Sequence, residues 1–216
     1  MLVVGLGNPG PRYAGSPHNV GFRVVDHFAE RHGVAAWGAQ GPSKSVPVHT
    51  GGGVWGERFG ARLCLAAVDS CEVVLLQPMA FMNRSGESVR EAMAFFQVDQ
   101  EHALIVHDEL DLPFGAIKLK RGGGEAGHNG LRSVSAELGT RDYARLRVGV
   151  GRPPGADITD YLLSPLPAAA ATQLDERLDA AEAAIGLWAK HGIEHAMNLV
   201  NRKAASELAQ SEGQPD

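Results

Sequence analysis

The chain has 216 residues, a formal net charge of −5 and 27 glycines. This length suits one large α/β domain with its own core, and the composition is that of an ordinary globular protein. We find no run of about 18 apolar residues and no basic region followed by a long apolar segment, so we expect neither a membrane span nor a secretory signal. Cys64 and Cys71 lack the spacing of a metal or redox motif, which favours reduced thiols and a cytoplasmic protein.

An apolar run opens the chain and leads into GLGNPG at 5–10, which fits the dinucleotide-binding pattern G-x-G-x-x-G. That pattern works only where a helix begins at once, because the pyrophosphate sits on the helix N-terminus. Here prolines at positions 9, 11 and 17 keep the chain in a loop until about His18. The sequence therefore argues against a dinucleotide site. It predicts a strand that runs into a rigid loop, with Asn8 and His18 near the two ends of that loop.

Apolar runs alternate with helically spaced apolar residues along the rest of the chain. Strands are expected at 1–5, 43–50, 54–59, 62–68, 73–78, 103–110, 117–121 and 145–151. Helices are expected at 18–32, 85–96 and 128–138, followed by a long helix with an apolar stripe and a shorter helix after Gly192. The stripe, which we expect to be core rather than interface, comprises Leu174, Leu178, Ala181, Ile185 and Trp188.

This alternation of strands and helices indicates a single α/β domain, built on a twisted, mixed and largely parallel sheet that helices flank. We assign the domain to residues 1–205 and expect residues 206–216 to form a disordered tail. No internal repeat and no shift in composition points to a second domain.

Positive charge is concentrated in one segment of this acidic chain. Residues 115–152 carry eight basic and three acidic side chains. Clustered charge of one sign is typical of an anion-binding site, and it also occurs on a solvated face. The basic residues are Lys118, Lys120, Arg121, Arg132, Arg141, Arg145, Arg147 and Arg152.

Four polar loops lie at strand ends or helix starts, where ligands bind in open α/β sheets. They span 7–19, 80–86, 107–113 and 122–131. They hold three asparagines, which either cap helices and turns or bind amide groups. They also hold three histidines, which either act as bases near neutral pH or serve as structural hydrogen-bonding residues. These side chains are Asn8, Asn83, Asn129, His18, His107 and His128.

The chemistry of these loops favours hydrolysis without a metal. Asp108, Glu109 and Asp111 can orient a histidine base, and no G-x-S-x-G elbow supports a serine nucleophile. A metal site made of His107, Asp108, Asp111 and a second histidine is the alternative, although the spacing matches no metal motif. The glycines at 122–127 and the helix that follows suit a phosphate group. The residues thus indicate hydrolysis of a group attached to a phosphorylated polymer or nucleotide.

In this order, the loops resemble those of the bacterial-type peptidyl-tRNA hydrolases. The matching stretches lie at 3–21, 81–86, 107–115, 126–131, 145–153 and 196–202. The resemblance implies a phosphorylase/hydrolase-like fold and hydrolysis of the ester that joins a peptide to the 3′ end of tRNA, which returns tRNA to translation after ribosomes stall. It also implies a cytoplasmic monomer that needs no cofactor, metal, membrane or obligatory protein partner.

The resemblance also implies a role for individual residues. His18 would be the general base that activates water, Asp108 would orient and polarise His18, and Asn8 would position the reacting groups. The substrate-binding residues would be Tyr13, Met82, Asn83, Gly127, His128 and Asn129. The residues that contact tRNA phosphate would be Lys118, Lys120 and Arg147.

Three positions depart from the family pattern. Ser16-Pro17 stands where Thr-Arg usually precedes the histidine, Ala80 replaces a common threonine, and Ala126 replaces a loop glycine. None removes a proposed catalytic group, so we expect activity, with tRNA affinity as the property that can differ. A non-catalytic RNA-binding module on the same fold is the alternative, because a fold alone does not fix function. Loss of His18, Asp108 or Asn8 would mark such a module, and all three are present.

Overall fold

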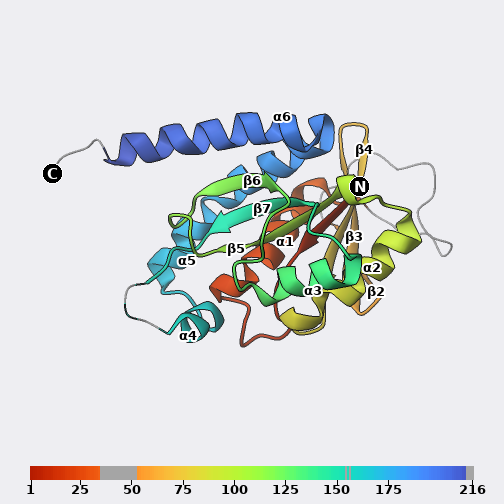
Figure 1. The fold of residues 1–216 in the computed structure, drawn as a ribbon, viewed down its shortest axis with the longest axis horizontal. Helices are drawn as coiled ribbons and strands as arrows, with labels where there is room; N and C mark the ends of the chain where they lie inside the picture. Colours follow the sequence, from red (N-terminus) through yellow and green to blue (C-terminus); the bar gives the residue numbers. More distant parts are fainter. Residues whose placement is uncertain (35–52, 154, 156, 213–216) are drawn as a thin grey trace.

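A computed structural model describes residues 1–34, 53–153, 155 and 157–212. Its seven-stranded sheet has the order β2-β3-β4-β1-β5-β7-β6 (Figure 1). The strands are β1 (Leu2–Gly5), β2 (Trp55–Arg58), β3 (Ala61–Val68), β4 (Cys71–Pro78), β5 (Ala103–Glu109), β6 (Ile117–Arg121) and β7 (Ala144–Gly149). The central strands β4, β1, β5 and β7 are parallel, whereas β2, β3 and β6 join by antiparallel pairing. The predicted mixed sheet is confirmed.

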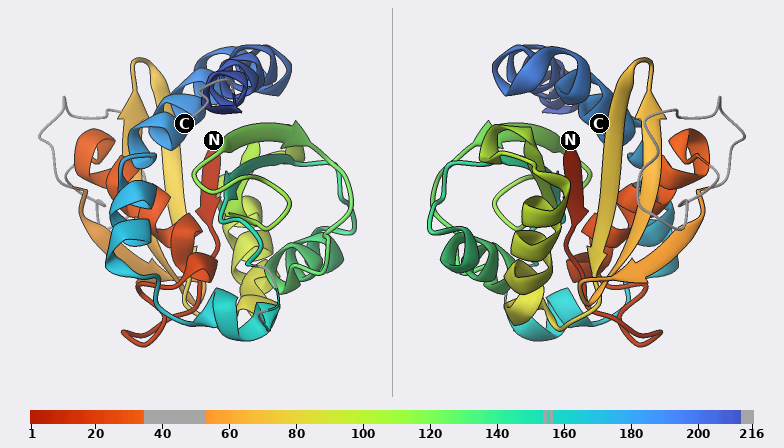
Figure 2. Two further views of the ribbon diagram at one scale, coloured as in Figure 1. Left: turned by 90° about the vertical axis from the view of Figure 1, so that its left-hand side faces the viewer. Right: turned by 90° about the vertical axis from the view of Figure 1, so that its right-hand side faces the viewer.

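Helices cover both faces of this sheet. Figure 2 shows α1 and the start of α6 on one side and α2 and α3 on the other. The α-helices are α1 (Val20–His32), α2 (Ser85–Phe96), α3 (Asn129–Leu138), α4 (Ile158–Leu163), α5 (Ala168–Asp175) and α6 (Leu178–Glu212). Short 3₁₀ helices are η1 (Pro17–Asn19), η2 (Met82–Arg84) and η3 (Gln100–His102). None of the helices in the described ranges is long and apolar enough to cross a membrane.

Each face has its own hydrophobic core. The core under α1, α5 and α6 contains Phe28, Ile185 and Trp188, all fully buried. The core under α2 and α3 contains Val89 and Val134, also fully buried. Burial of each such side chain stabilises the fold by about 1.5–3 kcal/mol. The apolar stripe from Leu174 to Trp188 is therefore core, as the sequence predicts.

Close approach of α1 to β1 fixes the loop between them. A Cβ atom on Gly5 would lie 2.3 Å from the carbonyl oxygen of Gly21, so both positions need glycine. The chain then forms turns over 11–15, and η1 begins only at Pro17. No helix follows the glycines of 5–10 at once, which agrees with the prediction against a dinucleotide site.

The helix 85–96 and the strand 117–121 are confirmed to the residue. The other strands and helices predicted up to residue 151 lie within a few residues of their observed bounds, except that the strand at 43–50 lies outside the described residues. The single long helix predicted before Gly192 is wrong, because α5 ends at Asp175 and α6 begins at Leu178.

The C-terminal helices differ from the prediction in three further ways. Helix α4 was not predicted as a separate helix: Asp157 caps it by accepting hydrogen bonds from the backbone N–H groups of Thr159 and Asp160. Gly192 does interrupt α6, with φ 76° and ψ 173°, but the part after it is longer rather than shorter. Helix α6 also reaches Glu212, into the segment 206–216 expected to be a tail.

Helix α6 also closes the outer edge of the sheet. The side chain of Asn201 accepts a hydrogen bond from the Leu119 N–H at 2.9 Å and donates one to the Leu119 carbonyl at 3.0 Å. These bonds replace part of the pairing that another strand would give to β6, an edge strand. The position of the basic strand is thereby tied to α6.

Candidate active site

A cleft of about 940 Å³ opens beyond the carboxyl ends of the parallel strands. The four polar loops of the sequence all contribute to it, as expected for an open α/β sheet. Of the predicted site residues, the cleft is lined by Asn8, Tyr13, His18, Met82, Asn83, Asp108, Lys120, Gly127, His128, Asn129 and Arg147. Lys118 lies on β6 two positions before Lys120, but it is not one of the described residues that line the cleft.

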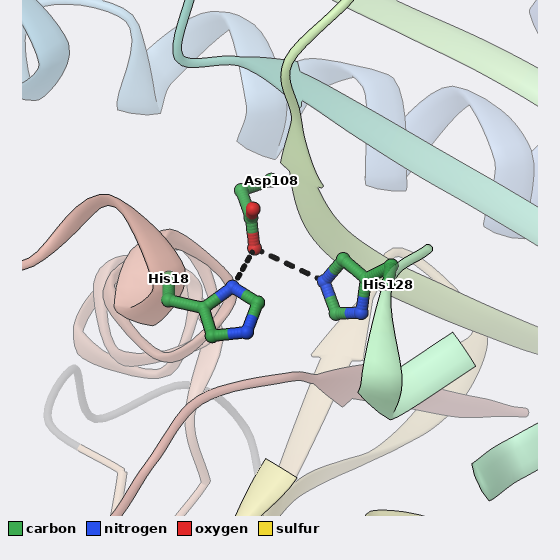
Figure 3. A group of neighbouring side chains, drawn as sticks. All are labelled: His18, Asp108 and His128. Carbon is green, nitrogen blue, oxygen red and sulfur yellow. Dashed lines mark hydrogen bonds and ion pairs between the residues drawn. The ribbon is translucent and has the colours of Figure 1, made fainter. Parts of the chain in front are cut away.

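Two histidines bind one carboxylate at the centre of the cleft (Figure 3). Oδ1 of Asp108 lies 2.8 Å from Nδ1 of His18 and 3.0 Å from Nε2 of His128. His18 is supplied by η1, Asp108 by the end of β5, and His128 by the residue that precedes α3. His18 is 7% exposed and Asp108 is 4% exposed. Segments far apart in the sequence thus meet in one hydrogen-bonded group.

The proton positions follow from the partners of each ring. Nδ1 of His128 accepts hydrogen bonds from the N–H groups of Gly130 and Leu131, at 3.1 and 3.3 Å, and so caps α3. The proton of neutral His128 is therefore on Nε2, which donates to Asp108. Nδ1 of His18 likewise donates to Asp108, which leaves the lone pair of His18 on Nε2. A histidine in this tautomer can accept a proton at Nε2.

The charges of the group follow from burial and from these bonds. Burial alone would raise the pKa of Asp108, but the charges and hydrogen bonds of His128 and His18 outweigh burial and hold that pKa below its ordinary value. Asp108 is therefore an anion at neutral pH, beside the ring that would become an imidazolium.

His107 lies next to this group but has different surroundings. Burial, with a smaller contribution from His128, lowers the pKa of His107 to about 3. Its Nδ1–H donates to the Asp108 carbonyl at 2.7 Å, and its buried Nε2 has no hydrogen-bond partner within the described part of the chain. His107 is therefore neutral near pH 7 and supports the backbone of Asp108.

Asn8 is held in place by interlocking amide bonds. Asn8 N–H donates to Oδ1 of Asn19 at 2.8 Å, and the Asn19 side-chain NH₂ donates to the Asn8 carbonyl at 2.9 Å. Oδ1 of Asn8 accepts from the Met82 N–H at 2.9 Å, which joins the first loop to η2. Of the hydrogen-bonding groups of Asn8, the side-chain NH₂ makes no bond to the residues that the structure describes, so it can donate to a ligand. The sequence did not single out Asn19, although it directly follows His18.

Other predicted substrate-binding residues lie around the rim. Met82 is buried, Tyr13 is half-buried, and Asn83 and Gly127 are exposed. The exposed Asn129 accepts a hydrogen bond from Arg132.

Two of the departures from the family pattern, at Ser16-Pro17 and at Ala126, have structural consequences. The buried Ser16 hydroxyl donates to the Tyr13 carbonyl at 2.8 Å, and Pro17 begins η1, which carries His18. Ala126 has φ 47°, a left-handed conformation that favours glycine. Alanine in place of glycine at position 126 therefore strains the local backbone.

The basic side chains of the cleft have different partners. Nε of Arg147 donates to Oε2 of Glu109 at 3.0 Å, and an Nη of Arg147 lies 2.9 Å from the same oxygen, so Glu109 orients an arginine rather than a histidine. Lys120 is exposed at the rim. Arg145, two residues before Arg147, is 2% exposed and binds backbone carbonyls instead of a carboxylate. No pattern in the sequence separates these two arginines.

The ligand atoms of His18, Asp108 and His128 lie within 4.8 Å of one another, close enough to suggest a metal site. The bonding favours another interpretation. Nδ1 of His128 already accepts two N–H groups, so Nε2 carries the proton and has no lone pair for a cation. His107, which the metal alternative includes, uses Nδ1 as a donor to a carbonyl. The donor set fits a proton-transfer group better than a metal centre.

The fold and the cleft thus define a class: an α/β protein whose parallel strands end at a histidine–carboxylate pair suited to general-base chemistry.

Comparison with known proteins narrows this class. The family model described as peptidyl-tRNA hydrolase matches residues 2–208. The peptidyl-tRNA hydrolase of Nocardia farcinica is 45% identical over 201 residues, which cover 93% of this chain and 95% of that protein. The one from Citrifermentans bemidjiense is 41% identical, with coverage of 94% and 98%. A crystal structure of peptidyl-tRNA hydrolase from Acinetobacter baumannii, 34% identical, has a TM-score of 0.77 and coverage of 93% and 94%. The chain belongs to the peptidyl-tRNA hydrolase family and is an enzyme.

Proposed function

We propose that this enzyme hydrolyses the ester bond between a peptide and the 3′ end of tRNA, with His18 as the general base. The observation that carries the proposal is the buried hydrogen bond between His18 and an ionised Asp108, at 2.8 Å in a polar cleft. The names of the relatives support the substrate, and the cleft supports the reaction. The alternative, a non-catalytic RNA-binding module, has no observation in its favour.

The reaction follows from the tautomer of His18. Nε2 takes a proton from water while the water oxygen attacks the ester carbonyl, and Asp108 stabilises the imidazolium that forms. The tetrahedral intermediate then breaks the bond between the carbonyl carbon and the 3′ oxygen of the ribose. The proton passes to that oxygen, and a free peptide acid and free tRNA leave. General-base catalysis of this kind contributes about 10²–10⁴-fold to the rate.

The remaining predicted residues would hold the substrate. The NH₂ group of Asn8 would bind near the reacting carbonyl, while Tyr13, Met82, Asn83, Gly127, His128 and Asn129 would surround the peptide and the end of the tRNA. Lys118, Lys120 and Arg147 would contact phosphate. We propose a cytoplasmic monomer of one domain, 1–205, that needs no cofactor or protein partner and recycles tRNA after ribosomes stall.

Hydrolysis of N-acetylaminoacyl-tRNA, with EDTA present, tests the proposal. We expect rapid cleavage by the wild-type enzyme and a loss of about 10²–10⁴-fold in His18→Ala. His102→Ala is the matched control, because His102 is exposed in η3 outside the cleft. Wild-type cleavage that EDTA abolishes would contradict base catalysis without a metal. Binding of tRNA without any cleavage would favour the RNA-binding module.

A further inference from the structure

Arg145 on β7 is a buried cation with an unusual set of partners. It is 2% exposed, and its Nη atoms donate to the carbonyls of Gly124 at 2.6 Å and Gly123 at 2.7 Å. A third, longer contact of 3.5 Å reaches the Arg141 carbonyl, and the guanidinium lies 4.8 Å from the centre of the Tyr143 ring. In the part of the chain that the structure describes, backbone oxygens and a ring surround this charge rather than a carboxylate.

Such burial makes Arg145 and the glycine loop at 122–127 depend on each other. Removing a guanidinium from water is costly, so each N–H needs a partner. Among the residues that the structure describes, none bonds the buried Nε of Arg145, and the two loop carbonyls satisfy most of the remaining N–H groups. A displaced loop would leave more of the charge unsatisfied. The guanidinium therefore favours one loop conformation over others.

That conformation orients the loop backbone. A trans peptide directs its C=O and the following N–H in opposite directions. When Arg145 holds the carbonyls of Gly123 and Gly124, the N–H groups of Gly124 and Glu125 point away from it. The loop residues from Gly124 to Gly127 line the cleft and connect β6, which carries Lys120, to His128. Gly123 has φ +104°, which permits this course.

We infer that Arg145 is a positioning residue: although it belongs to the wall of the cleft, it is only 2% exposed, and it sets the loop 122–127 in the conformation that receives peptidyl-tRNA without contacting the substrate itself. This inference rests on the proposed function. The His128 side chain is held separately, because its Nδ1 accepts from the N–H groups of Gly130 and Leu131, while the loop holds the His128 backbone, whose N–H donates to the Glu125 carbonyl at 2.8 Å. Disturbing Arg145 therefore affects substrate binding and leaves the histidine–carboxylate group in place.

Arg145→Lys is the test, because lysine keeps the charge but cannot hold two carbonyls in a planar fork. We expect faster hydrogen exchange of the amides at 123–127, a KM raised by about tenfold and a kcat within about twofold of wild type. The dependence of log KM on log salt concentration should be unchanged, because no phosphate contact is lost. Arg90→Lys is the control, since Arg90 is exposed and pairs with Glu137.

Two results would overturn the inference. A salt slope lower by ~0.7–0.9 would make Arg145 a direct phosphate ligand. Unchanged loop exchange with an unchanged KM would leave it a purely structural residue. Gly122→Ala keeps the test valid if Arg145→Lys does not fold: it strains the loop at φ +63°, the added Cβ meets no atom closer than 3.5 Å, and Arg145 stays intact. This variant should raise KM by a similar factor, and a wild-type KM would also contradict the inference.

The same experiments separate the two proposals. If the wild-type enzyme cleaves no peptidyl-tRNA, the proposed function fails, yet the exchange of the loop amides still reports whether Arg145 holds the loop. If the wild-type enzyme is active and the loop amides of Arg145→Lys exchange as in wild type, only the role of Arg145 fails.

Discussion

At the centre of the cleft, side chains bind side chains: one oxygen of Asp108 accepts from His18 and His128, and all three lie largely buried. At the basic end, a loop with positive-φ glycines is held through its backbone by Arg145, and the exposed Lys120 stands beside it. Proton transfer depends on tautomer and on distances of about 3 Å, whereas attraction to phosphate acts over several ångströms. Changes at the first region should therefore affect kcat, and changes at the second should affect KM.

Asp108→Asn, a change in the first region, should give the largest effect, which is a loss of kcat. Asparagine is neutral, so it no longer stabilises the His18 imidazolium, and where its NH₂ group faces Nδ1 of His18 it imposes the wrong tautomer. We expect kcat to fall by about 10²–10⁴-fold with KM little changed. Single-turnover hydrolysis measures this. Asp111→Asn is the control, because the exposed Asp111 also lines the cleft but pairs with Arg152. Equal losses in both variants would contradict a special role for Asp108.

Lys120→Met should show the opposite behaviour. It removes one proposed phosphate contact, so we expect KM to rise roughly tenfold, about 1.4 kcal/mol, with kcat unchanged. The salt slope of binding should fall by ~0.7–0.9. Lys190→Met, which breaks the ion pair between Lys190 on α6 and Asp69 in the turn between β3 and β4, controls for loss of a surface charge. A fall in kcat rather than a rise in KM would show that the two regions are not separable.

The pH dependence of stability tests the buried His107, which lies beside the histidine–carboxylate group. Because burial lowers the pKa of His107 to about 3, the folded state disfavours the charged ring. Stability is then full above about pH 6.5 and falls as the pH drops from there towards 3. His107→Asn keeps a donor for the Asp108 carbonyl but does not titrate, so its Tm should fall less between about pH 6.5 and 4.5. The exposed His102→Asn should retain the wild-type pH dependence.

The parts of the molecule that local pattern determines could be predicted. Apolar spacing defines the helix at 85–96, and alternation defines the strand at 117–121. The boundary between α5 and α6 could not be found this way, because Leu174 and Leu178 keep helical spacing across the break while each packs into the same core. A pattern of burial reports which residues face the core, not whether the backbone between them is continuous.

The site shows the same division. That the four loops meet follows from the rule for parallel strand ends. Which histidine is the base could not be derived from spacing, because it depends on which ring nitrogen meets Asp108 and which meets a backbone group. Arg145 and Arg147 alternate identically along β7, yet one lies under a loop and the other meets Glu109. Strand alternation predicts that the two arginines lie on the same face of the sheet. Only the tertiary fold determines what covers each of them.

The smallest expected effect is at Ala126, where the loop itself departs from the family. With φ 47°, alanine is strained, and glycine would relieve that strain at the cost of more unfolded-state entropy. Ala126→Gly should therefore raise the free energy of unfolding by up to about 1 kcal/mol. The neighbouring Gly127→Ala, at φ +80° with no atom near the added Cβ, should lower it by a similar amount, about 1 kcal/mol. Urea unfolding measures both. If strain alone distinguishes these positions, kcat stays at the wild-type value in each variant; a change in kcat would mean that the loop and the histidine–carboxylate group are coupled after all.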